Sequence, residues 1–514
     1  MRIKEKKMLK ARIIYDKDYQ ISRIDPRLYG SFVEHLGRCC YGGIYEPGHA
    51  TSDSLGFRED VKALVREAGI TGLRYPGGNF VSGYNWKDGI GPRDSRPVRK
   101  DLAWGSEETN AVGTDEFMRF AGDVGADVYM AVNLGTGTPA EAGEEVEYCN
   151  AVPGTFWADQ RVRNGQKAPY GIRTWCLGNE MDGDWQICMR TPEEYARVCR
   201  ETAKIVKWVD PATEVVACGS CTNEVGHKPF GIWDRTVLEE CYDRIDYLSI
   251  HRYLNYHPNL NLAYPNINDE SDIPFLFRDL QNYIDAINGA IRLVKEEKHT
   301  EKVVKLSFDE WGVITRTGAV PGIGSQTFGY ANFSQLDAVV YGGILCTLLN
   351  NADSVKIACQ SLLVNEGGMI STDPSGKAIR QTTFYPFRDV AHLGRGIALR
   401  TGGKMPQQET GHHGKQDSVI SAASYDAESG EINVFAVNCD MQESCEVSLN
   451  LRGFGRLEGV GRRELFCPDP YQSNTFEQEN NVLPETAPLE DPVDGECRAV
   501  LKPHSWNVFR FRTK

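Results

Sequence analysis

Long apolar runs are missing from this chain of 514 residues. No stretch of about 18 consecutive apolar residues occurs, so no membrane-spanning helix is expected. The opening residues, Met-Arg-Ile-Lys-Glu-Lys-Lys, are charged, and the apolar segment of a secretory signal does not follow them. The sequence therefore predicts neither a membrane-embedded nor a secreted protein.

Basic residues are also in the minority. Lys and Arg number 57 against 71 Asp and Glu, which gives a net charge of −14 and a pI near 5.3. Nucleic acids and anionic membranes are bound through basic surfaces, so neither is expected as a partner. A neutral substrate is compatible with this charge.

Recognisable metal, redox and phosphate motifs are absent as well. The 15 cysteines are scattered, as expected for reduced thiols of a cytoplasmic protein. Cys39 and Cys40 are adjacent, and Cys218 and Cys221 form a C-x-x-C, but neither pair has a second pair at ligand spacing. No H-x-x-x-H, H-E-x-x-H, EF-hand or phosphate-loop pattern occurs. We therefore expect no metal and no cofactor.

What the sequence does contain, from residue 25 to 388, is an alternation of apolar runs and amphipathic helical stretches. Eight candidate strands lie at 28–33, 72–76, 127–133, 173–178, 214–219, 246–251, 303–308 and 354–359. The intervening helices include 191–209, 280–295 and 333–349, the first with a capping box formed by Thr191 and Glu194. This pattern predicts an α/β fold, a (β/α)8 TIM barrel. An open doubly wound sheet is the alternative.

The pattern changes after residue 388. Short runs rich in β-branched and aromatic residues at 419–425, 432–438, 445–451 and 506–511 predict an all-β sandwich, jelly-roll-like, over 389–514. Residues 402–416 are expected to form a surface loop. The N-terminal segment 1–24 contains a short apolar run and is expected to pair with this sandwich.

Two glutamates end buried strands of the predicted barrel. Glu180 closes the motif Arg-Thr-Trp-Cys-Leu-Gly-Asn-Glu, and Glu310 closes Val-Val-Lys-Leu-Ser-Phe-Asp-Glu. The carboxyl ends of barrel strands carry the active site, and two carboxylates there can cleave a glycosidic bond. Glu180 is the expected acid/base, with Asp182 as an alternative acid. Glu310 is the expected nucleophile, and strand alternation turns Asp309 away from it.

Other polar residues surround these positions in the sequence. Arg74 precedes a Gly pair and can either hold a nucleophilic carboxylate ionised or form an ordinary salt bridge. His251 ends the sixth strand and is either a site residue or a hydrogen-bonded core histidine. Asn179 can hold a sugar hydroxyl, and Trp311 offers a flat wall for a sugar face.

These motifs, with Glu-His-Leu-Gly-Arg at 34–38 and Thr-Phe-Tyr-Pro-Phe at 383–387, resemble those of the glycoside hydrolase family 51 α-L-arabinofuranosidases. The resemblance implies a barrel with a β-sandwich, two catalytic glutamates, retention of anomeric configuration, no metal and a homohexamer. By position, it makes Glu180 the acid/base and Glu310 the nucleophile. The residues that it places on the furanose hydroxyls are Glu34, Asn79, Asn179 and Tyr253, with Arg74 and His251 around the nucleophile.

Two departures from the family pattern concern the sugar pocket. The family has Ala-Gln-Leu-Val-Asn after the eighth strand, and its Gln touches the sugar, whereas Leu362 stands in that place here. Gln360, two residues earlier, lies on the same strand face and is the candidate replacement. Arg252 stands where the family commonly has Gln, and residues 365–369 also differ.

The sequence thus predicts an exo-acting, retaining α-L-arabinofuranosidase of arabinan catabolism, acting in the cytoplasm on arabinofuranosyl oligosaccharides. Its two carboxyl groups are expected about 5–5.5 Å apart. Activity on another furanoside, or as an endo-β-glucanase, is the alternative that Leu362 leaves open. A non-catalytic carbohydrate-binding relative is a third, against which the intact pair of glutamates argues.

Overall fold

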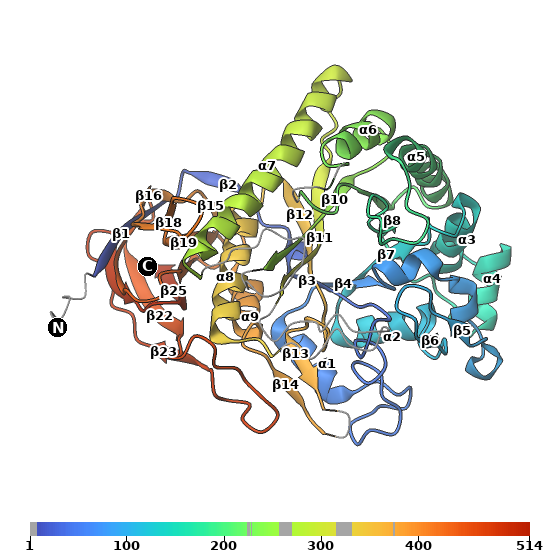
Figure 1. The fold of residues 1–514 in the computed structure, drawn as a ribbon, viewed down its shortest axis with the longest axis horizontal. Coiled ribbons are helices and arrows are strands. Elements are labelled where there is room, and N and C mark those ends of the chain that lie inside the picture. The colour runs from blue at the N-terminus through green and yellow to red at the C-terminus, as the bar shows by residue number, and fades with distance from the viewer. Residues whose placement is uncertain (1–7, 224–226, 228, 256–269, 315–331, 374–375) are drawn as a thin grey trace.

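The computed structural model describes residues 8–223, 227, 229–255, 270–314, 332–373 and 376–514. Two parts lie side by side, a helix-covered barrel and a group of β-sheets that holds both the beginning and the end of the chain (Figure 1). The barrel forms the larger part and carries the site described below.

A closed barrel of parallel strands confirms the predicted (β/α)8 fold. Its strands follow chain order around the barrel, and the last pairs with the first. They are buried on both faces, which explains why several of their sequences are largely apolar instead of alternating. The strands are β3 (Gly30–Phe32), β4 (Gly72–Tyr75), β7 (Asp127–Val132), β8 (Thr174–Leu177), β9 (Glu214–Cys218), β10 (Tyr247–Asn255), β11 (Lys305–Ile314) and β12 (Val355–Gln360).

Helices cover the barrel between successive strands (Figure 1). Among the described residues they are α1 (Glu59–Ala68), α2 (Thr114–Val124), α3 (Pro139–Asn150), α4 (Phe156–Arg163), α5 (Pro192–Val209), α6 (Ile232–Cys241), α7 (Ile273–Glu297), α8 (Gln335–Asn350) and α9 (Phe384–Leu393). Short 3-10 turns are η1 (Pro26–Tyr29), η2 (Asn79–Gly83), η3 (Trp86–Gly89), η4 (Arg93–Ser95) and η5 (Glu270–Asp272). The predicted capping box is present, because Thr191 accepts from Glu194 N–H and Glu194 closes back on the cap.

The remaining strands form two larger sheets and three strand pairs. The sheets have the orders β16-β1-β21-β24 and β2-β15-β19-β20-β25-β22-β23, and the pairs are β5–β6, β13–β14 and β17–β18. Their bounds are β1 (Leu9–Asp16), β2 (Gln20–Arg23), β5 (Arg99–Lys100), β6 (Glu107–Glu108), β13 (Ile370–Thr372), β14 (Ala378–Arg380), β15 (Ile397–Leu399), β16 (Gly402–Lys404), β17 (Gln407–Glu409), β18 (Lys415–Asp417), β19 (Val419–Asp426), β20 (Glu431–Asn438), β21 (Cys445–Arg452), β22 (Leu457–Leu465), β23 (Pro484–Ala487), β24 (Glu496–Leu501) and β25 (Ser505–Thr513).

The two larger sheets enclose a core of their own, to which β1 contributes Ile13 and Tyr15 and β20 contributes Val434. The N-terminal strand β1 pairs with β16 and β21, and β2 pairs with β15. One expectation is wrong here. Residues 402–416 are not a plain loop, because β16, β17 and the start of β18 fall within them.

Helix α8 joins the two parts of the molecule. It lies between the barrel and the sheets (Figure 1), and every residue except the last is buried. A helix that is apolar all round is expected to be enclosed in this way. Gly342 lets Trp506 of β25 approach closely, since a Cβ on Gly342 would lie 2.4 Å from the indole ring.

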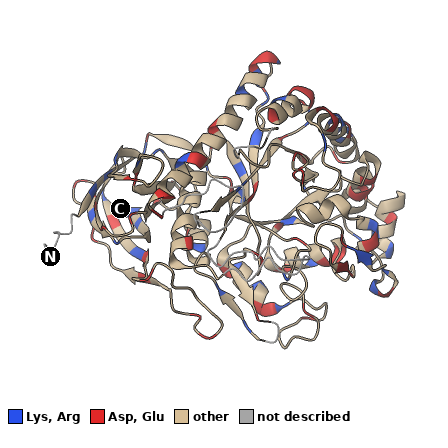
Figure 2. Cartoon of the chain, in the orientation of Figure 1, with Lys and Arg blue, Asp and Glu red and all other residues tan. Residues whose placement is uncertain are grey.

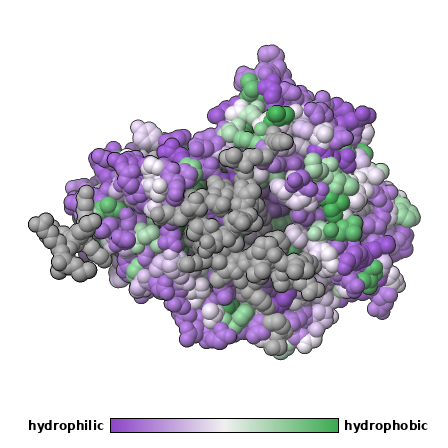
Figure 3. Space-filling view, viewed as in Figure 1, coloured by the Kyte–Doolittle hydropathy of each residue, from purple (hydrophilic) through white to green (hydrophobic). Residues whose placement is uncertain are grey.

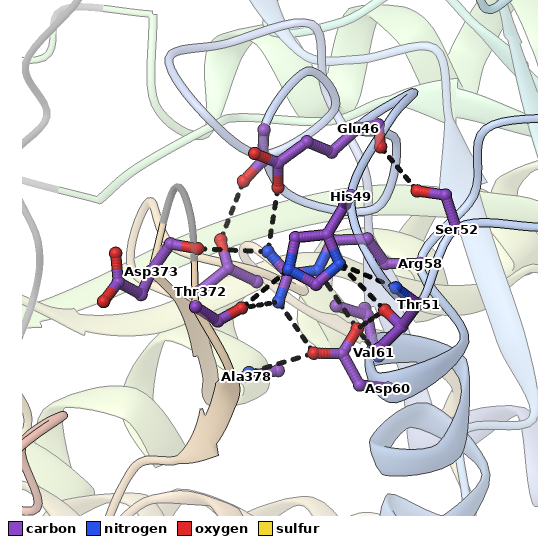
Figure 4. Close-up of polar contacts among 12 residues, drawn as sticks. Glu46, His49, Thr51, Ser52, Arg58, Asp60, Val61, Thr372, Asp373 and Ala378 are labelled. Atoms are coloured by element: carbon purple, nitrogen blue, oxygen red, sulfur yellow. Dashed lines mark hydrogen bonds and ion pairs between the residues drawn. The ribbon is translucent and has the colours of Figure 1, made fainter.

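A buried arginine holds the long segment after β3 against the hairpin of β13 and β14 (Figure 4). Arg58 is fully buried and donates to the carboxylates of Glu46 at 2.9 Å and Asp60 at 2.7 Å. It also donates to the carbonyl oxygens of Asp373 at 3.2 Å and Gly376 at 2.8 Å. This network joins the segment after β3 to the hairpin.

Acidic and basic residues are intermixed along the helices around the barrel (Figure 2). The face in Figure 3 is mainly hydrophilic where it is coloured, with scattered apolar patches. None of the helices in the described parts of the chain has the length and apolar character needed to cross a membrane.

Candidate active site

Glu180 and Glu310 face each other at the carboxyl ends of the barrel strands. Three atoms lie within 4.8 Å of one another: one carboxylate oxygen of Glu180, one of Glu310 and a ring nitrogen of His251. The Glu180 side chain is 13% exposed and that of Glu310 is 6% exposed. The two carboxylates predicted from strand ends are therefore brought together in a nearly enclosed position.

Glu180 lies in the loop after β8 and has two hydrogen-bond partners. Its Oε1 is 2.9 Å from His251 Nδ1, and its Oε2 accepts from Trp185 Nε1 at 2.6 Å. Burial by itself would raise the pKa of Glu180, but the hydrogen bond and charge of His251, with the bond from Trp185, hold that pKa below its usual range. The proton of this hydrogen bond can therefore reside on Glu180 Oε1 or on His251 Nδ1.

Glu310 is held by one cation and one phenol. Arg74 Nη1 donates to Oε1 at 2.7 Å, and the Tyr253 hydroxyl lies 2.7 Å from Oε2 and 2.7 Å from Ser361 Oγ. Burial, joined by the charge of Glu180, raises the pKa of Glu310 in spite of His251, Arg74 and Tyr253.

His251 lies at the centre of three carboxylates. Its Nδ1 is 2.9 Å from Glu180 and 3.6 Å from Glu310, and its Nε2 is 3.2 Å from Asp309. Burial would lower the pKa of His251, but Glu310, Asp309 and Glu180 outweigh it and raise that pKa to about 10. Of the two interpretations left open by the sequence, the structure places His251 in the site.

Asp309 corrects the sequence-based expectation. It points into the barrel beside Glu310, with its carboxylate hydrogen-bonded to Ser249 and His251 and 3.5 Å from Arg74 Nε. The reason is an extra residue in β11. The register shifts between Phe308 and Trp311 against β12, so strict alternation fails there. Glu310 also does not end its strand, since β11 continues to Ile314.

Glu34 and the glycine pair form another wall of the site. Glu34 Oε1 accepts from Phe80 N–H and from Trp104 Nε1, each at 3.0 Å. Burial raises the pKa of Glu34 to about 8. A Cβ on Gly78 would lie 3.2 Å from Glu310 Oε1 and 3.3 Å from Glu34 Oε2, so a larger residue would require one of these carboxylates or the loop to shift. Asn79 follows directly, half-buried, at the start of η2.

Arg74 also fixes Asn179. Its Nη2 donates to Asn179 Oδ1 at 2.7 Å, and the Asn179 amide nitrogen lies 3.4 Å from Gln186 Oε1. Arg74 is buried and lies over the ring of Phe32. One arginine therefore orients residues of β11 and of the loop after β8.

Two predicted contact residues do not reach the site. Trp311 is fully buried and packs against Tyr341 and Phe387, so it presents no face to a sugar. The extra residue in β11 turns Trp311 toward the helices. Gln360 is also fully buried, and its amide donates to the carbonyl of Gly367 at 3.0 Å. It does not stand in for a pocket glutamine.

The departures from the family pattern are buried rather than open to the site. Arg252 pairs with Asp279 of α7 at 2.5 Å and donates to Thr222 Oγ1 at 3.3 Å. Leu362 is 3% exposed. Glu366 accepts from Arg38 N–H at 3.0 Å, and burial raises the pKa of Glu366 to about 7.

Sequence reasoning missed two tryptophans and one serine. Trp185 and Trp104 donate to Glu180 and Glu34, and Ser361 contacts Tyr253. Trp185 lies five residues after Glu180 and is 49% exposed. Its place in the loop that follows a catalytic strand is a signal that the sequence offered, because such loops build barrel active sites.

Comparison with known proteins places the chain among arabinofuranosidases. Residues 64–268 match the "Alpha-L-arabinofuranosidase 1 domain" family, and residues 309–505 match the "Alpha-L-arabinofuranosidase C-terminal domain" family. The intracellular exo-α-(1→5)-L-arabinofuranosidase 1 of Bacillus subtilis (strain 168) is 41% identical over 513 residues, 98% of this chain and 99% of the relative. An exo-α-(1→6)-L-arabinofuranosidase of Bifidobacterium longum is 40% identical, over 97% of this chain and 96% of the relative.

Solved structures agree along nearly the whole chain. A family 51 α-L-arabinofuranosidase from Bifidobacterium longum has a TM-score of 0.90 and 38% identity, over 98% of this chain and 100% of that one. An arabinose complex of the α-L-arabinofuranosidase from Thermotoga maritima has a TM-score of 0.85 and 32% identity, over 97% and 99% of the two chains.

Proposed function

The chain belongs to the family 51 α-L-arabinofuranosidases, and from this premise we propose that it releases terminal arabinofuranose with retention of configuration. Glycoside hydrolysis by two carboxylates takes one of two courses. Inversion needs room for a water between them, whereas retention needs the nucleophile beside the sugar. The spacing of the pair supports the second course.

The observation that carries this proposal is the approach of Glu180 to Glu310. Inverting enzymes hold their carboxyl groups about 6.5–9.5 Å apart and retaining enzymes about 5–5.5 Å apart. Here the nearest oxygens lie within 4.8 Å. This spacing favours direct attack by a carboxylate on the anomeric carbon over attack by an intervening water.

Glu310 fits the nucleophile. Arg74 and Tyr253 direct hydrogen-bond donors at its two oxygens, which orients the carboxylate and opposes the rise in its pKa that burial and Glu180 cause. Attack of one oxygen on the anomeric carbon forms a glycosyl-enzyme ester as the glycosidic bond breaks. The second oxygen remains with the Tyr253 hydroxyl.

Glu180 fits the acid/base. It is the more exposed of the pair and lies in a loop, where it can reach the leaving oxygen. It gives that oxygen a proton in the first step and takes one from water in the second. His251, 2.9 Å away, holds a proton that Glu180 can receive.

The relatives' names support arabino-oligosaccharides as substrates and the interior of the cell as the place of action. Several are named intracellular exo-α-(1→5)-L-arabinofuranosidases, and one is named exo-α-(1→6)-L-arabinofuranosidase. We take the (1→5) linkage as the preferred one. Comparing kcat/KM on α-(1→5)- and α-(1→6)-linked arabinobiose tests this preference, and a faster reaction on the (1→6) compound contradicts it.

Azide rescue tests the two roles. In Glu180→Ala, an aryl α-L-arabinofuranoside with a good leaving group still forms the glycosyl-enzyme, and azide enters the empty space to release it as a glycosyl azide of retained configuration. Turnover of substrates with poor leaving groups should fall by about 10²- to 10⁴-fold. Glu310→Ala should show no turnover through a glycosyl-enzyme. A single displacement by azide in Glu310→Ala would give an inverted glycosyl azide, which agrees with these roles. A glycosyl azide of retained configuration from Glu310→Ala, or one of inverted configuration from Glu180→Ala, would mean that the roles are exchanged.

A further inference from the structure

Beside the acid/base glutamate, three side chains of metal-binding type converge. Asp182, Cys221 and His227 each place one ligand atom so that the three atoms lie within 4.8 Å of one another. Asp182 belongs to the loop after β8, and the other two belong to the segment between β9 and α6. A carboxylate oxygen, a thiol sulfur and an imidazole nitrogen are donors that Zn²⁺ uses in proteins.

The ligands are held in place by the fold. Asp182 Oδ2 accepts from Cys221 N–H at 3.0 Å and lies 2.7 Å from His227 Nε2. The residue before the cysteine, Ser220, is fixed by Asp234, which accepts from its backbone N–H at 2.8 Å and from its hydroxyl at 2.5 Å. An ion would therefore find two of its ligands already ordered, which lowers the entropy cost of binding.

One oxygen of Asp182 has no partner in the described structure. The residue is 3% exposed, and its Oδ1 is buried without a hydrogen bond among the residues described. Leaving a buried polar atom unsatisfied costs about 1–3 kcal/mol, and more for a charged group. A cation bound to this carboxylate would compensate that cost. If Asp182 were only a buried structural residue, the cost of its unsatisfied oxygen would have no compensation among the described contacts.

We propose that Asp182, Cys221 and His227 bind one thiophilic divalent cation of the Zn²⁺ type, with water completing the coordination. The Cys221 thiol loses its proton to solvent, and the thiolate and the carboxylate together balance the two positive charges. His227 contributes the lone pair of Nε2, and the neutral ring then carries its proton on Nδ1 instead of on the nitrogen that faces Asp182. No electron transfer is involved.

The ion would join the segment after β9 to the loop that carries Glu180. The ring of His227 lies 6.5 Å from that of Trp185, and Trp185 donates to Glu180 at 2.6 Å. Fixing His227 therefore steadies the surroundings of the acid/base residue. The role is structural, because the three ligands are separate from the carboxylate pair that attacks the sugar.

Co²⁺ is the probe for this site, since its absorption reports both tetrahedral coordination and a thiolate ligand. Titrating chelator-treated, untagged full-length protein should give a thiolate-to-cobalt band that saturates at one equivalent per chain. Zn²⁺ should remove the band and raise Tm, because binding to the folded state stabilises it. Cys221→Ser and His227→Gln should lose both effects, whereas Cys188→Ser, which changes an exposed cysteine, should keep them.

The proposal is overturned if no thiolate band forms at one equivalent, or if the band survives Cys221→Ser. A second measurement uses the wild-type protein alone and so does not depend on the folding of a variant. Near pH 7.5, Zn²⁺ binding in weak buffer should release about one proton per chain, and release of none contradicts thiolate ligation. Both experiments measure metal binding, so their failure would leave the proposed hydrolase function untouched.

Discussion

At the scale of single residues, the site is organised by two cations that share three carboxylates. Arg74 contacts Glu310 and approaches Asp309, while His251 contacts Glu180 and Asp309. The residue pattern left open whether Arg74 and His251 belong here, and the family resemblance placed both around the nucleophile. The sequence could not predict that Asp309 joins them, since a one-residue bulge in β11 leaves no clear trace in the local sequence.

The raised pKa of His251 makes one prediction about stability. A histidine has an unfolded pKa near 6.5, and the folded value here is about 10. The folded protein thus holds this proton more tightly, so the stability contributed is fully present below pH 6.5 and is lost as the pH rises toward 10. We expect the Tm advantage of the wild type over His251→Gln to shrink steadily between pH 6 and 10. An advantage that is constant or grows over this range contradicts the charged imidazolium.

Leu362 stands at the position where the family has a glutamine that touches the sugar. The sequence made Gln360 the candidate replacement for the missing glutamine, but the Gln360 amide is buried against Gly367 and Ser31. The curated relatives nevertheless act on arabinofuranosides by name. Gln360 therefore does not take the place of the family's glutamine.

At the scale of elements, strand positions follow directly from the sequence, whereas strand ends do not. Apolar runs identified all eight barrel strands, and several of these runs lack polar alternation because the strands are buried on both faces. The ends differ because tertiary contacts set them. β10 and β11 run on to Asn255 and Ile314, past the positions where polar residues suggested that they end.

The loop after β4 provides the prediction at this scale. A methyl group on Gly78 would lie 3.2–3.4 Å from oxygens of Glu310 and Glu34, so Gly78→Ala must displace one of these carboxylates or the loop itself. Because small displacements of catalytic groups are costly, kcat/KM should fall by roughly 10- to 100-fold. Gly289→Ala in α7 is the control, since no atom lies within 4 Å of its added Cβ, and it should leave kcat/KM unchanged. Equal activity of the two variants would contradict the role given to Gly78.

At the scale of the whole molecule, β1 and β2 from the start of the chain complete the sheets formed by its end. The division predicted at 24/25 and 388/389 stays a prediction. Its second boundary falls inside α9, which ends at Leu393 before β15 begins. Helical periodicity ends gradually in a sequence, so a boundary placed from composition differs by a few residues.

The homohexamer remains a prediction at this scale, because it came from the family resemblance and not from any pattern of residues. Light scattering of the purified protein should give a mass six times the 57.4 kDa of the chain. A mass of one chain at micromolar concentration would contradict it.

The central claim is that Glu180 and Glu310 form a retaining pair, and the configuration of the first product tests it most directly. Hydrolysis of an aryl α-L-arabinofuranoside in the presence of methanol transfers the sugar to an acceptor that fixes its anomeric configuration. Because two inversions restore the original configuration, proton NMR should show methyl α-L-arabinofuranoside as the transfer product. Formation of the β-anomer, or release of β-arabinofuranose as the first product, would contradict the account.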